Sequence, residues 1–354
     1  MTGAATGPGR KHERPSAISR ITRCRPRSLP APDSGLPRVK PPRLIEIDRQ
    51  DPAALRAELV RELTAIPAVV SPKYFYDALG SRLFAAITEL PEYYPTRTEA
   101  AIFTRHIDEI ASQIPQGLTL VDIGAGNCEK AARLLRPLHV QAYVAVDISV
   151  AFLRDSLLRL QAHYPDIEML GVGSDFSTRL ELPGDVGDGP RQLFYPGSSI
   201  GNFTPAQARH FLGRLRHAAA GGGLLIGVDL LKPVEVLEAA YDDSLGVTAA
   251  FNRNLLRHVN QLVGSDFVLA DWRHRAVFDS VQSRIEMHLE AVRPLRVRWP
   301  GGERAFAAGE RIHTENSYKW RADDFAGLLA DVGFSAVRRW TDERGWFAVF
   351  LAQA

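Results

Sequence analysis

The chain of 354 residues is poor in the features that define several classes of protein. Its only cysteines, Cys24 and Cys128, exclude a disulfide-stabilised framework and a closed zinc site. No run approaches the roughly 18 apolar residues of a membrane span, and the N-terminal segment lacks the apolar core of a secretory signal. Apolar residues make up 45% of the chain and charged residues 24%, as in a globular protein stabilised by packing. We expect a cytoplasmic enzyme or binding protein with no membrane partner.

Lysine is also scarce, and the charge is unevenly distributed. Only six of the 43 basic residues are lysines, a bias that we attribute to a GC-rich coding sequence. Residues 1–43 hold ten basic and two acidic residues, a net charge of +8, together with eight prolines. The rest of the chain carries 33 basic and 39 acidic residues, a net charge of −6. Because residues 1–43 have few large apolar side chains to bury, we predict a disordered basic arm.

From about residue 98 to 231, short apolar runs alternate with amphipathic segments. The runs cover residues 118–123, 143–148, 167–172, 192–195 and 224–230. Continuous apolar runs suit strands that are covered on both faces, and helices between them supply the crossovers that parallel pairing needs. The sequence therefore predicts an α/β fold with a doubly wound, mostly parallel sheet.

The pattern changes after residue 231. Helical segments at 235–241 and 248–263 precede an alternating stretch at 281–292 and a hairpin in the same antiparallel region, with its turn at residues 300–302. A last helix at 322–332 and strands at 336–340 and 346–352 close the chain. This predicts an α+β insertion in the α/β domain, with the terminal helix and hairpin completing the large sheet.

A Gly-x-Gly turn, Gly124-Ala125-Gly126, joins a predicted strand to a predicted helix. Glycines let the backbone approach a ligand closely, and the free N–H groups of the helix start carry partial positive charge. A dinucleotide fingerprint needs a third glycine, but Glu129 occupies that position. The turn better suits a ligand with an amino-acid part, whose carboxylate Lys130 can face.

The next two predicted strands also end in carboxylates. Asp147 can accept hydrogen bonds from both hydroxyls of a ribose. Asp175 can accept from an adenine amine, while Phe176 offers its backbone N–H to the ring. With Gly124 and Lys130, these residues at three successive strand ends predict S-adenosylmethionine as the cofactor, held by a Rossmann-like sheet of the class I methyltransferase type.

Polar and aromatic residues crowd in four further segments. These are 72–77 (PKYFYD), 90–97 (LPEYYPTR), 197–202 (GSSIGN) and 312–319 (IHTENSYK). Together with Tyr241-Asp242-Asp243, residues 246–254 and Ile285-Glu286-Met287, they resemble the histidine-specific Nα-methyltransferases, which form hercynine in ergothioneine biosynthesis. The resemblance runs from about residue 50 to the C-terminus.

The resemblance implies a role for individual residues. The cofactor contacts fall on the five residues named above, and no metal is implied. The substrate contacts fall on Asn202 and Tyr241 at the carboxylate, on Tyr76, Gly197 and Asn202 at the α-amine, and on Tyr93, Glu315 and Ser317 at the imidazole, with Met287 lining the pocket. Tyr76 and Asn202 are the expected catalytic residues. Glu315 is the expected specificity residue, because a buried carboxylate without a partner costs about 1–3 kcal/mol.

Three nearby residues have other expected roles. Regular alternation of the strand predicts that His313 shares a face with Glu315 and Ser317, behind the residues that touch the substrate. Asn316, where an apolar residue is expected in this family, then points away from the pocket. Cys128 has no partner for thiol catalysis and is expected to be a packing residue.

The domain organisation and the activity follow from these expectations. Residues 44–97 and 232–318 are predicted to form the inserted substrate-binding domain, and residues 98–231 and 319–354 the cofactor domain. The implied activity is trimethylation of the α-amine of L-histidine to hercynine by a monomer.

Two alternatives remain open. One is an Nα-methyltransferase for another aromatic amino acid, and the other is a nucleic-acid-associated methyltransferase that uses the basic arm. Nucleic acid is not the expected partner, because the folded part is net acidic and has no basic stripe with interleaved aromatic residues.

Overall fold

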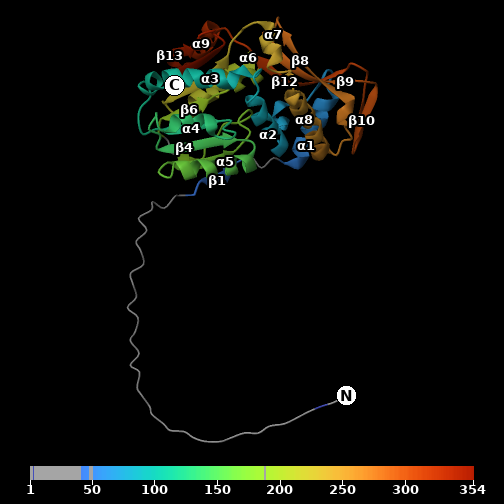
Figure 1. Ribbon diagram of the computed structural model, residues 1–354, viewed down its shortest axis with the longest axis horizontal. Coiled ribbons are helices and arrows are strands. Elements are labelled where there is room, and N and C mark those ends of the chain that lie inside the picture. Colours follow the sequence, from blue (N-terminus) through green and yellow to red (C-terminus); the bar gives the residue numbers. More distant parts are fainter. Residues whose placement is uncertain (1–2, 4–40, 48–50, 187–188) are drawn as a thin grey trace. The chain divides into compact units, whose positions relative to one another are not determined.

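The structure is a computed structural model that describes residues 3, 41–47, 51–186 and 189–354. The predicted basic arm therefore lies outside the described residues, except for Gly3 and residues 41–43. Every helix and strand given below belongs to the unit formed by residues 38–354 (Figure 1).

The bounds of the elements are as follows. The strands are β1 (Arg43–Glu46), β2 (Ala68–Val69), β3 (Thr119–Ile123), β4 (Ala142–Asp147), β5 (Glu168–Gly173), β6 (Arg191–Tyr195), β7 (Gly223–Asp229), β8 (Trp272–Asp279), β9 (Arg284–Ala291), β10 (Leu295–Trp299), β11 (Gly302–Phe306), β12 (Arg311–Tyr318), β13 (Ser335–Thr341) and β14 (Phe347–Gln353). The α-helices are α1 (Pro52–Thr64), α2 (Ala78–Thr88), α3 (Tyr94–Ala111), α4 (Glu129–Leu135), α5 (Val150–His163), α6 (Pro205–Ala218), α7 (Val234–Ala239), α8 (Val247–Val263) and α9 (Ala322–Asp331). Short 3-10 helices are η1 (Pro72–Phe75), η2 (Gly184–Val186), η3 (Ser199–Asn202) and η4 (Leu269–Asp271).

The large sheet has the order β1-β5-β4-β3-β6-β7-β14-β13. The first six strands in this order, from β1 to β7, pair in parallel. Strand β14 runs antiparallel to both β7 and β13. Every residue of β7 is buried, which explains why all its residues before Asp229 are apolar or glycine. The predicted α/β sheet, with a terminal helix and hairpin that complete it, is confirmed.

Strand β1 was not predicted from the sequence. It pairs in parallel with β5, from Arg43 opposite Leu170 to Glu46 opposite Gly173. Residues 43–46 therefore extend the large sheet, so Arg43 does not belong to the arm and residues 44–46 do not belong with the segment 44–97. Four residues at a sheet edge give too short a pattern to predict, because their strand conformation depends on a partner more than 120 residues away.

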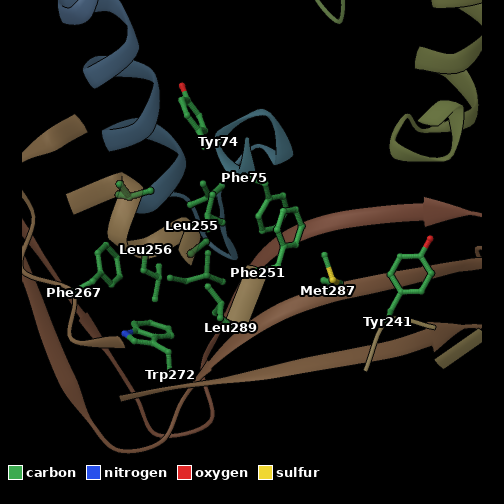
Figure 2. Packing of buried hydrophobic residues seen from close by; sticks show 14 of the residues in the cluster. Tyr74, Phe75, Tyr241, Phe251, Leu255, Leu256, Phe267, Trp272, Met287 and Leu289 are labelled. Carbon is green, nitrogen blue, oxygen red and sulfur yellow. The ribbon is translucent and has the colours of Figure 1, made fainter. Parts of the chain in front are cut away.

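A second sheet has the order β2-β12-β9-β8, and helix α8 packs against it. Figure 2 shows Phe251 and Leu255 of α8 above the strands that carry Trp272 and Leu289. The hairpin of β10 and β11 forms a separate two-stranded sheet rather than a part of this one. The α+β character of the insertion agrees with the expectation, but α3 crosses the predicted boundary at residues 97 and 98, so the exact domain division stays a prediction.

The two sheets meet where β7 and β12 end. Trp320 donates its backbone N–H to the Asp229 carbonyl at 3.1 Å, and Leu231 donates to the Trp320 carbonyl at 3.1 Å. This contact brings the carboxyl end of the large sheet against the last residues of β12, where the predicted substrate residues lie. Within the described part of the chain, no helix is long and apolar enough to cross a membrane.

Candidate functional site

The loop after β3 has the close backbone approach expected from its glycines. Gly124 and Gly126 have φ angles of +73° and +53°, which a residue with a side chain adopts only at a cost. The Gly124 N–H donates to the Val146 carbonyl at 2.8 Å. A Cβ atom at Gly124 would lie 3.4 Å from the ring of Phe176. Gly124 and Phe176, predicted as cofactor residues from different strand ends, therefore lie side by side.

Asp147 joins the loops that follow β3 and β4. Its Oδ2 accepts the Gly126 N–H at 2.9 Å, and its Oδ1 accepts the Ser149 N–H at 2.8 Å. Burial raises the pKa of Asp147, and these backbone hydrogen bonds oppose the rise. The carboxylate is thus fixed in orientation beside the glycine turn, which suits the predicted contact with ribose hydroxyls.

Asp175 connects the cofactor region to the segment 72–77. The side chain is 8% exposed, and its Oδ1 accepts the Ser177 N–H at 3.1 Å. Lys73 of η1 lies with its Nζ 3.6 Å from Asp175 Oδ2 and 2.7 Å from Glu58 Oε1. Sequence reasoning did not single out Lys73, although its segment was noted. Lys73 holds the substrate-side segment against the third strand end.

Lys130 is paired with a residue that the sequence did not reveal. Glu99 of α3 is 2% exposed, and its Oε2 lies 2.7 Å from Lys130 Nζ. The other oxygen, Oε1, accepts the Gly197 N–H at 2.8 Å. Glu99 therefore links a predicted cofactor residue to a predicted substrate residue. The only signal was an acidic residue on the apolar side of a helix, because its partners are 31 and 98 residues away.

Gly227 leaves the space that Glu99 occupies, and Gly227→Ala tests this arrangement. A Cβ atom at residue 227 would lie 2.0 Å from Glu99 Oε1. Displacing this buried carboxylate breaks its bonds to Lys130 and Gly197, so we expect a loss of about 1–3 kcal/mol in unfolding free energy and about tenfold weaker S-adenosylmethionine binding. Chemical denaturation and calorimetric titration measure these two quantities.

Gly213 provides the matched control. It lies in the middle of α6, and a Cβ atom there would meet nothing within 4 Å. Gly213→Ala is expected to stabilise the protein by about 0.5–1 kcal/mol, because alanine favours the helix, and to leave cofactor binding unchanged. Equal stability changes in the two variants would refute the proposed clash with Glu99.

Several predicted substrate residues form a second group of buried and partly buried side chains. The Tyr93 ring lies 6.2 Å from the Phe84 ring and 6.3 Å from the Tyr241 ring, between centroids. The Tyr76 ring contacts the same Phe84 at 5.8 Å. Burial raises the pKa of Tyr76, Tyr93 and Tyr241 well above 10, and the charge of Glu315 raises each further. The three tyrosines therefore feel the charge of the same carboxylate and keep their hydroxyl protons at neutral pH.

Glu315 lies opposite Met287 in the pairing of β12 with β9. Burial raises the pKa of Glu315 to about 7, whereas the charge of Lys319 lowers it. Among the described residues, none donates a side-chain hydrogen bond to this carboxylate. Figure 2 shows Met287 near Tyr241 in the same core. The structure thus places Glu315, Met287 and Tyr241 together, with the Glu315 acceptor oxygens available.

Glycine and serine shape the turn that carries Asn202. A Cβ atom at Gly201 would lie 2.9 Å from the Tyr318 carbonyl oxygen and 3.4 Å from Ser317 Oγ, so the η3 turn packs directly on the end of β12. Ser198 has a φ of +58°, and its Oγ accepts the Asp229 N–H at 2.8 Å. These contacts bring the predicted residues Gly197, Asn202 and Ser317 to one place.

A buried ion cluster lies behind Ser317 and Tyr241. Lys319 Nζ lies 2.8 Å from Asp229 Oδ2, and Lys232 Nζ lies 2.5 Å from Asp229 Oδ1, with all three side chains 0–1% exposed. Lys319 also donates to Ser317 Oγ at 2.7 Å and to the Tyr241 hydroxyl at 3.1 Å. No role was predicted for Asp229, Lys232 or Lys319. The signal for Lys232 and Lys319 was lysine itself, which is rare in this chain.

The prediction for His313 was wrong. The pairing of β12 with β9 shifts between His313 and Glu315, so Thr314 is an extra residue at a β-bulge. His313 pairs with His288 and its Nε2 lies 2.9 Å from Asn316 Oδ1, on the face opposite to Glu315. The bulge thus separates His313 from Glu315, while Asn316 points away from the pocket as expected.

Two further observations complete the site. Cys128 is buried, and burial raises the pKa of its thiol to about 12, so it stays protonated and fits the predicted packing role. In the described ranges, no group of three or more His, Cys, Asp and Glu side chains could hold a metal ion.

Comparison with known proteins gives a consistent result. A family model described as histidine-specific methyltransferase, SAM-dependent, matches residues 55–354. The chain is 42% identical to histidine N-alpha-methyltransferase of Mycolicibacterium smegmatis, over 84% of this chain and 94% of that protein. A protein of the same name from Mycobacterium tuberculosis is 40% identical over the same shares. Ergothioneine biosynthesis protein 1 of Neurospora crassa is 31% identical over 84% of this chain and 35% of that protein. The chain belongs to the family of histidine-specific, SAM-dependent methyltransferases.

Proposed function

We propose that the protein transfers three methyl groups in succession from S-adenosylmethionine to the α-amine of L-histidine and so forms hercynine. The observation that carries this proposal is the partly buried Glu315 carboxylate, which lies opposite Met287, raises the pKa of Tyr76, Tyr93 and Tyr241 by its charge, and accepts no side-chain hydrogen bond from the described residues. An imidazole N–H supplies the missing donor. An indole or a phenol also carries one donor, but neither has the second ring nitrogen with which a neutral imidazole can accept a hydrogen bond from a hydroxyl such as that of Ser317 or Tyr93.

The cofactor residues fit S-adenosylmethionine on the geometry of this chain. Gly124 lies without a side chain against Phe176, and Asp147 is fixed by two backbone N–H groups. We assign the ribose to Asp147, the adenine to Asp175 and Phe176, and the methionine carboxylate to Lys130, which Glu99 holds in place. When bound, S-adenosylmethionine supplies an electrophilic methyl group.

Positioning of the amine is the main task of the chain's own residues. Reacting groups held at near-attack distance gain several orders of magnitude in effective concentration. The α-ammonium of a peptide terminus titrates near ~8, so a neutral fraction of an α-amine exists at physiological pH and a strong dedicated base is not required. Because burial keeps the Tyr76 hydroxyl protonated, Tyr76 orients the neutral amine by hydrogen bonding and does not remove its proton as a phenolate.

The remaining assignments concern the two ends of the substrate. We assign the carboxylate to Asn202 and Tyr241, the amine to Tyr76, Gly197 and Asn202, and the imidazole to Tyr93, Glu315 and Ser317, with Met287 against the ring. Neutral polar neighbours around the amine suit three successive transfers, since a tight ion pair would hold the proton on the nitrogen and leave no lone pair to react. Asn202 and Tyr76 are the proposed catalytic residues.

The proposal includes the organisation of the enzyme. We infer that residues 47–97 and 232–318 bind the substrate, whereas the large sheet binds the cofactor. We also propose that the enzyme is a monomer and that it works in the cytoplasm. Size-exclusion chromatography with light scattering tests the monomer.

Mass spectrometry of the product tests the proposed function. The purified protein is incubated with S-adenosylmethionine and each of the twenty amino acids. We expect histidine to be the best acceptor, with a final product that carries three added methyl groups on the α-nitrogen. Faster methylation of tryptophan or tyrosine would favour an enzyme for another aromatic amino acid, and the absence of any amino-acid turnover would refute the proposal.

A further inference from the structure

The lysines of this chain have an unusual distribution. Lys11 and Lys40 lie outside the described residues, and the other four all form ion pairs around the candidate site. Arginine fills the other basic positions of the described part. Lys73 and Lys130 are partly exposed, whereas the side chains of Lys232 and Lys319 are 0% exposed. Burial of a lysine side chain is unfavourable unless its charge is paired, so Lys232 and Lys319 are the two lysines whose position needs a structural explanation.

Lys319 uses all of its donors. A lysine ammonium has three N–H groups and no acceptor. These groups face Asp229 Oδ2 at 2.8 Å, Ser317 Oγ at 2.7 Å and the Tyr241 hydroxyl at 3.1 Å. No N–H of Lys319 is left for the substrate, so any effect of Lys319 on the substrate passes through Ser317 and Tyr241.

The two hydroxyls that Lys319 binds also contact each other. Ser317 Oγ lies 2.6 Å from the Tyr241 hydroxyl oxygen, so one of them donates to the other. Both hydroxyl oxygens accept a hydrogen bond from Lys319. The two hydroxyl groups have one hydrogen each, and the hydrogen bond between them uses one of these two hydrogens. The second hydrogen has no acceptor within the cluster, because Lys319 cannot accept. The pair therefore offers one hydroxyl donor to a ligand.

The cluster holds two ammonium groups around the single carboxylate of Asp229, and the charge of Lys319 also acts on Glu315, whose pKa it lowers. Lys232 directs its three N–H groups to Asp229 Oδ1 at 2.5 Å, to the Tyr94 hydroxyl at 2.7 Å and to the Leu230 carbonyl at 2.6 Å. Two ammonium groups thus share the single carboxylate of Asp229. Because the two ammonium groups share one carboxylate, a further anion beside Lys319, such as the carboxylate of a ligand, is stabilised. A hydroxyl that accepts from an ammonium is also a stronger donor in turn.

We propose that Lys319 is a positioning residue that selects substrates with a carboxylate, by making the Tyr241–Ser317 pair a donor toward that group and by placing a positive charge directly behind it. The proposal rests on the proposed function, since the carboxylate concerned is that of histidine. Lys319 does not touch the substrate. Lys232 neutralises Asp229 but contacts neither hydroxyl, so it does not share this role.

The test compares Lys319→Met with Lys232→Met. Each variant removes one buried ammonium from Asp229 and keeps a side chain of similar length, but only the first removes the contacts to Ser317 and Tyr241. The acceptors are histidine and histamine, which share the imidazole and the primary amine and differ in the carboxylate. The readout is the ratio of kcat/KM for the two acceptors at saturating S-adenosylmethionine.

We expect Lys319→Met to reduce the preference for histidine by about tenfold or more, through a higher KM for histidine, while histamine turnover changes by less than about threefold. Lys232→Met should keep the ratio of the unchanged protein. In a Tyr241→Phe background, Lys319→Met should have a smaller effect on the ratio, because the hydroxyl through which it acts is gone.

An unchanged ratio in Lys319→Met, or an equal loss in Lys232→Met, would overturn the proposal. Thermal unfolding and the Kd for S-adenosylmethionine establish that each variant is folded, and Lys319→Gln, which keeps a donor but no charge, decides the question if Lys319→Met does not fold. If the unchanged protein does not methylate histidine, the proposed function fails instead, so the two failures are distinguishable.

Discussion

Glu315→Gln is expected to raise the KM for histidine by about 100-fold while changing the Kd for S-adenosylmethionine by less than about twofold. A charged hydrogen bond in a buried site contributes about 1.5–3 kcal/mol, and 100-fold corresponds to about 2.7 kcal/mol. Glutamine keeps the size of the side chain, so the pocket keeps its shape while its charge is lost. Steady-state kinetics with each substrate varied in turn, together with calorimetry for the cofactor, measure the effect.

The same variant has a second readout that a misfolded protein would not give. Burial raises the pKa of Glu315 from 4.5 to about 7. The folded protein is therefore most stable when Glu315 is protonated, and it loses stability as the pH rises from 4.5 through 7 and the side chain ionises. Glutamine carries no such loss. Without substrate at pH 8, Glu315→Gln should therefore have an unfolding free energy up to about 3 kcal/mol larger than that of the unchanged protein, and a higher unfolding temperature. Both differences should shrink at pH 5. A variant that is less stable at both pH values, or an equal loss of histidine and cofactor affinity, would contradict the role of Glu315.

Asp147→Asn is expected to weaken S-adenosylmethionine binding by about 100-fold. Both oxygens of Asp147 accept backbone N–H groups, from Gly126 at 2.9 Å and from Ser149 at 2.8 Å. Asparagine replaces one oxygen by an NH₂ group, which then faces an N–H donor and has nothing to accept from a ribose hydroxyl. The loss of charge-assisted hydrogen bonds and the displaced glycine turn together account for about 2.7 kcal/mol. Calorimetric titration of the cofactor measures the affinity directly.

The control for Asp147→Asn is the KM for histidine at saturating cofactor. Asp147 belongs to the loops after β3 and β4, so the histidine KM should stay within about threefold. Asp155→Asn, an exposed substitution in α5, provides a matched change of charge and should leave both affinities unchanged. A histidine KM that rises as much as the cofactor Kd would show that Asp147 does not act on the cofactor alone.

The sequence patterns behind the proposed cofactor residues are local. The strands and the Gly124 turn follow from short apolar runs and from glycine chemistry, and parallel pairing brings successive strand ends to one edge of the sheet. Gly124, Asp147 and Phe176 therefore converge in the structure as their positions in the chain predicted. The substrate residues were placed by resemblance instead, because Tyr76, Tyr93 and Glu315 lie on separate elements and no period or spacing relates them.

The tertiary structure decided which other side chains contact these predicted site residues. One extra residue at Thr314 moved His313 to the far face of β12, since a bulge reverses the alternation that sequence reasoning assumes. Glu99 reaches Lys130 and Gly197, and Lys319 reaches Asp229, only because α3, β7 and β12 meet at the edge of the large sheet.

The sequence by itself determined the α/β class, the glycine turn after β3 and the uneven charge, because each depends on residues close together in the chain. The scarcity of lysine had no functional interpretation in the sequence. Two of the six lysines are enclosed around Asp229 behind the predicted substrate residues. Only the tertiary structure shows the position of these two lysines, because burial and hydrogen-bond partners depend on contacts between segments that are distant in the chain.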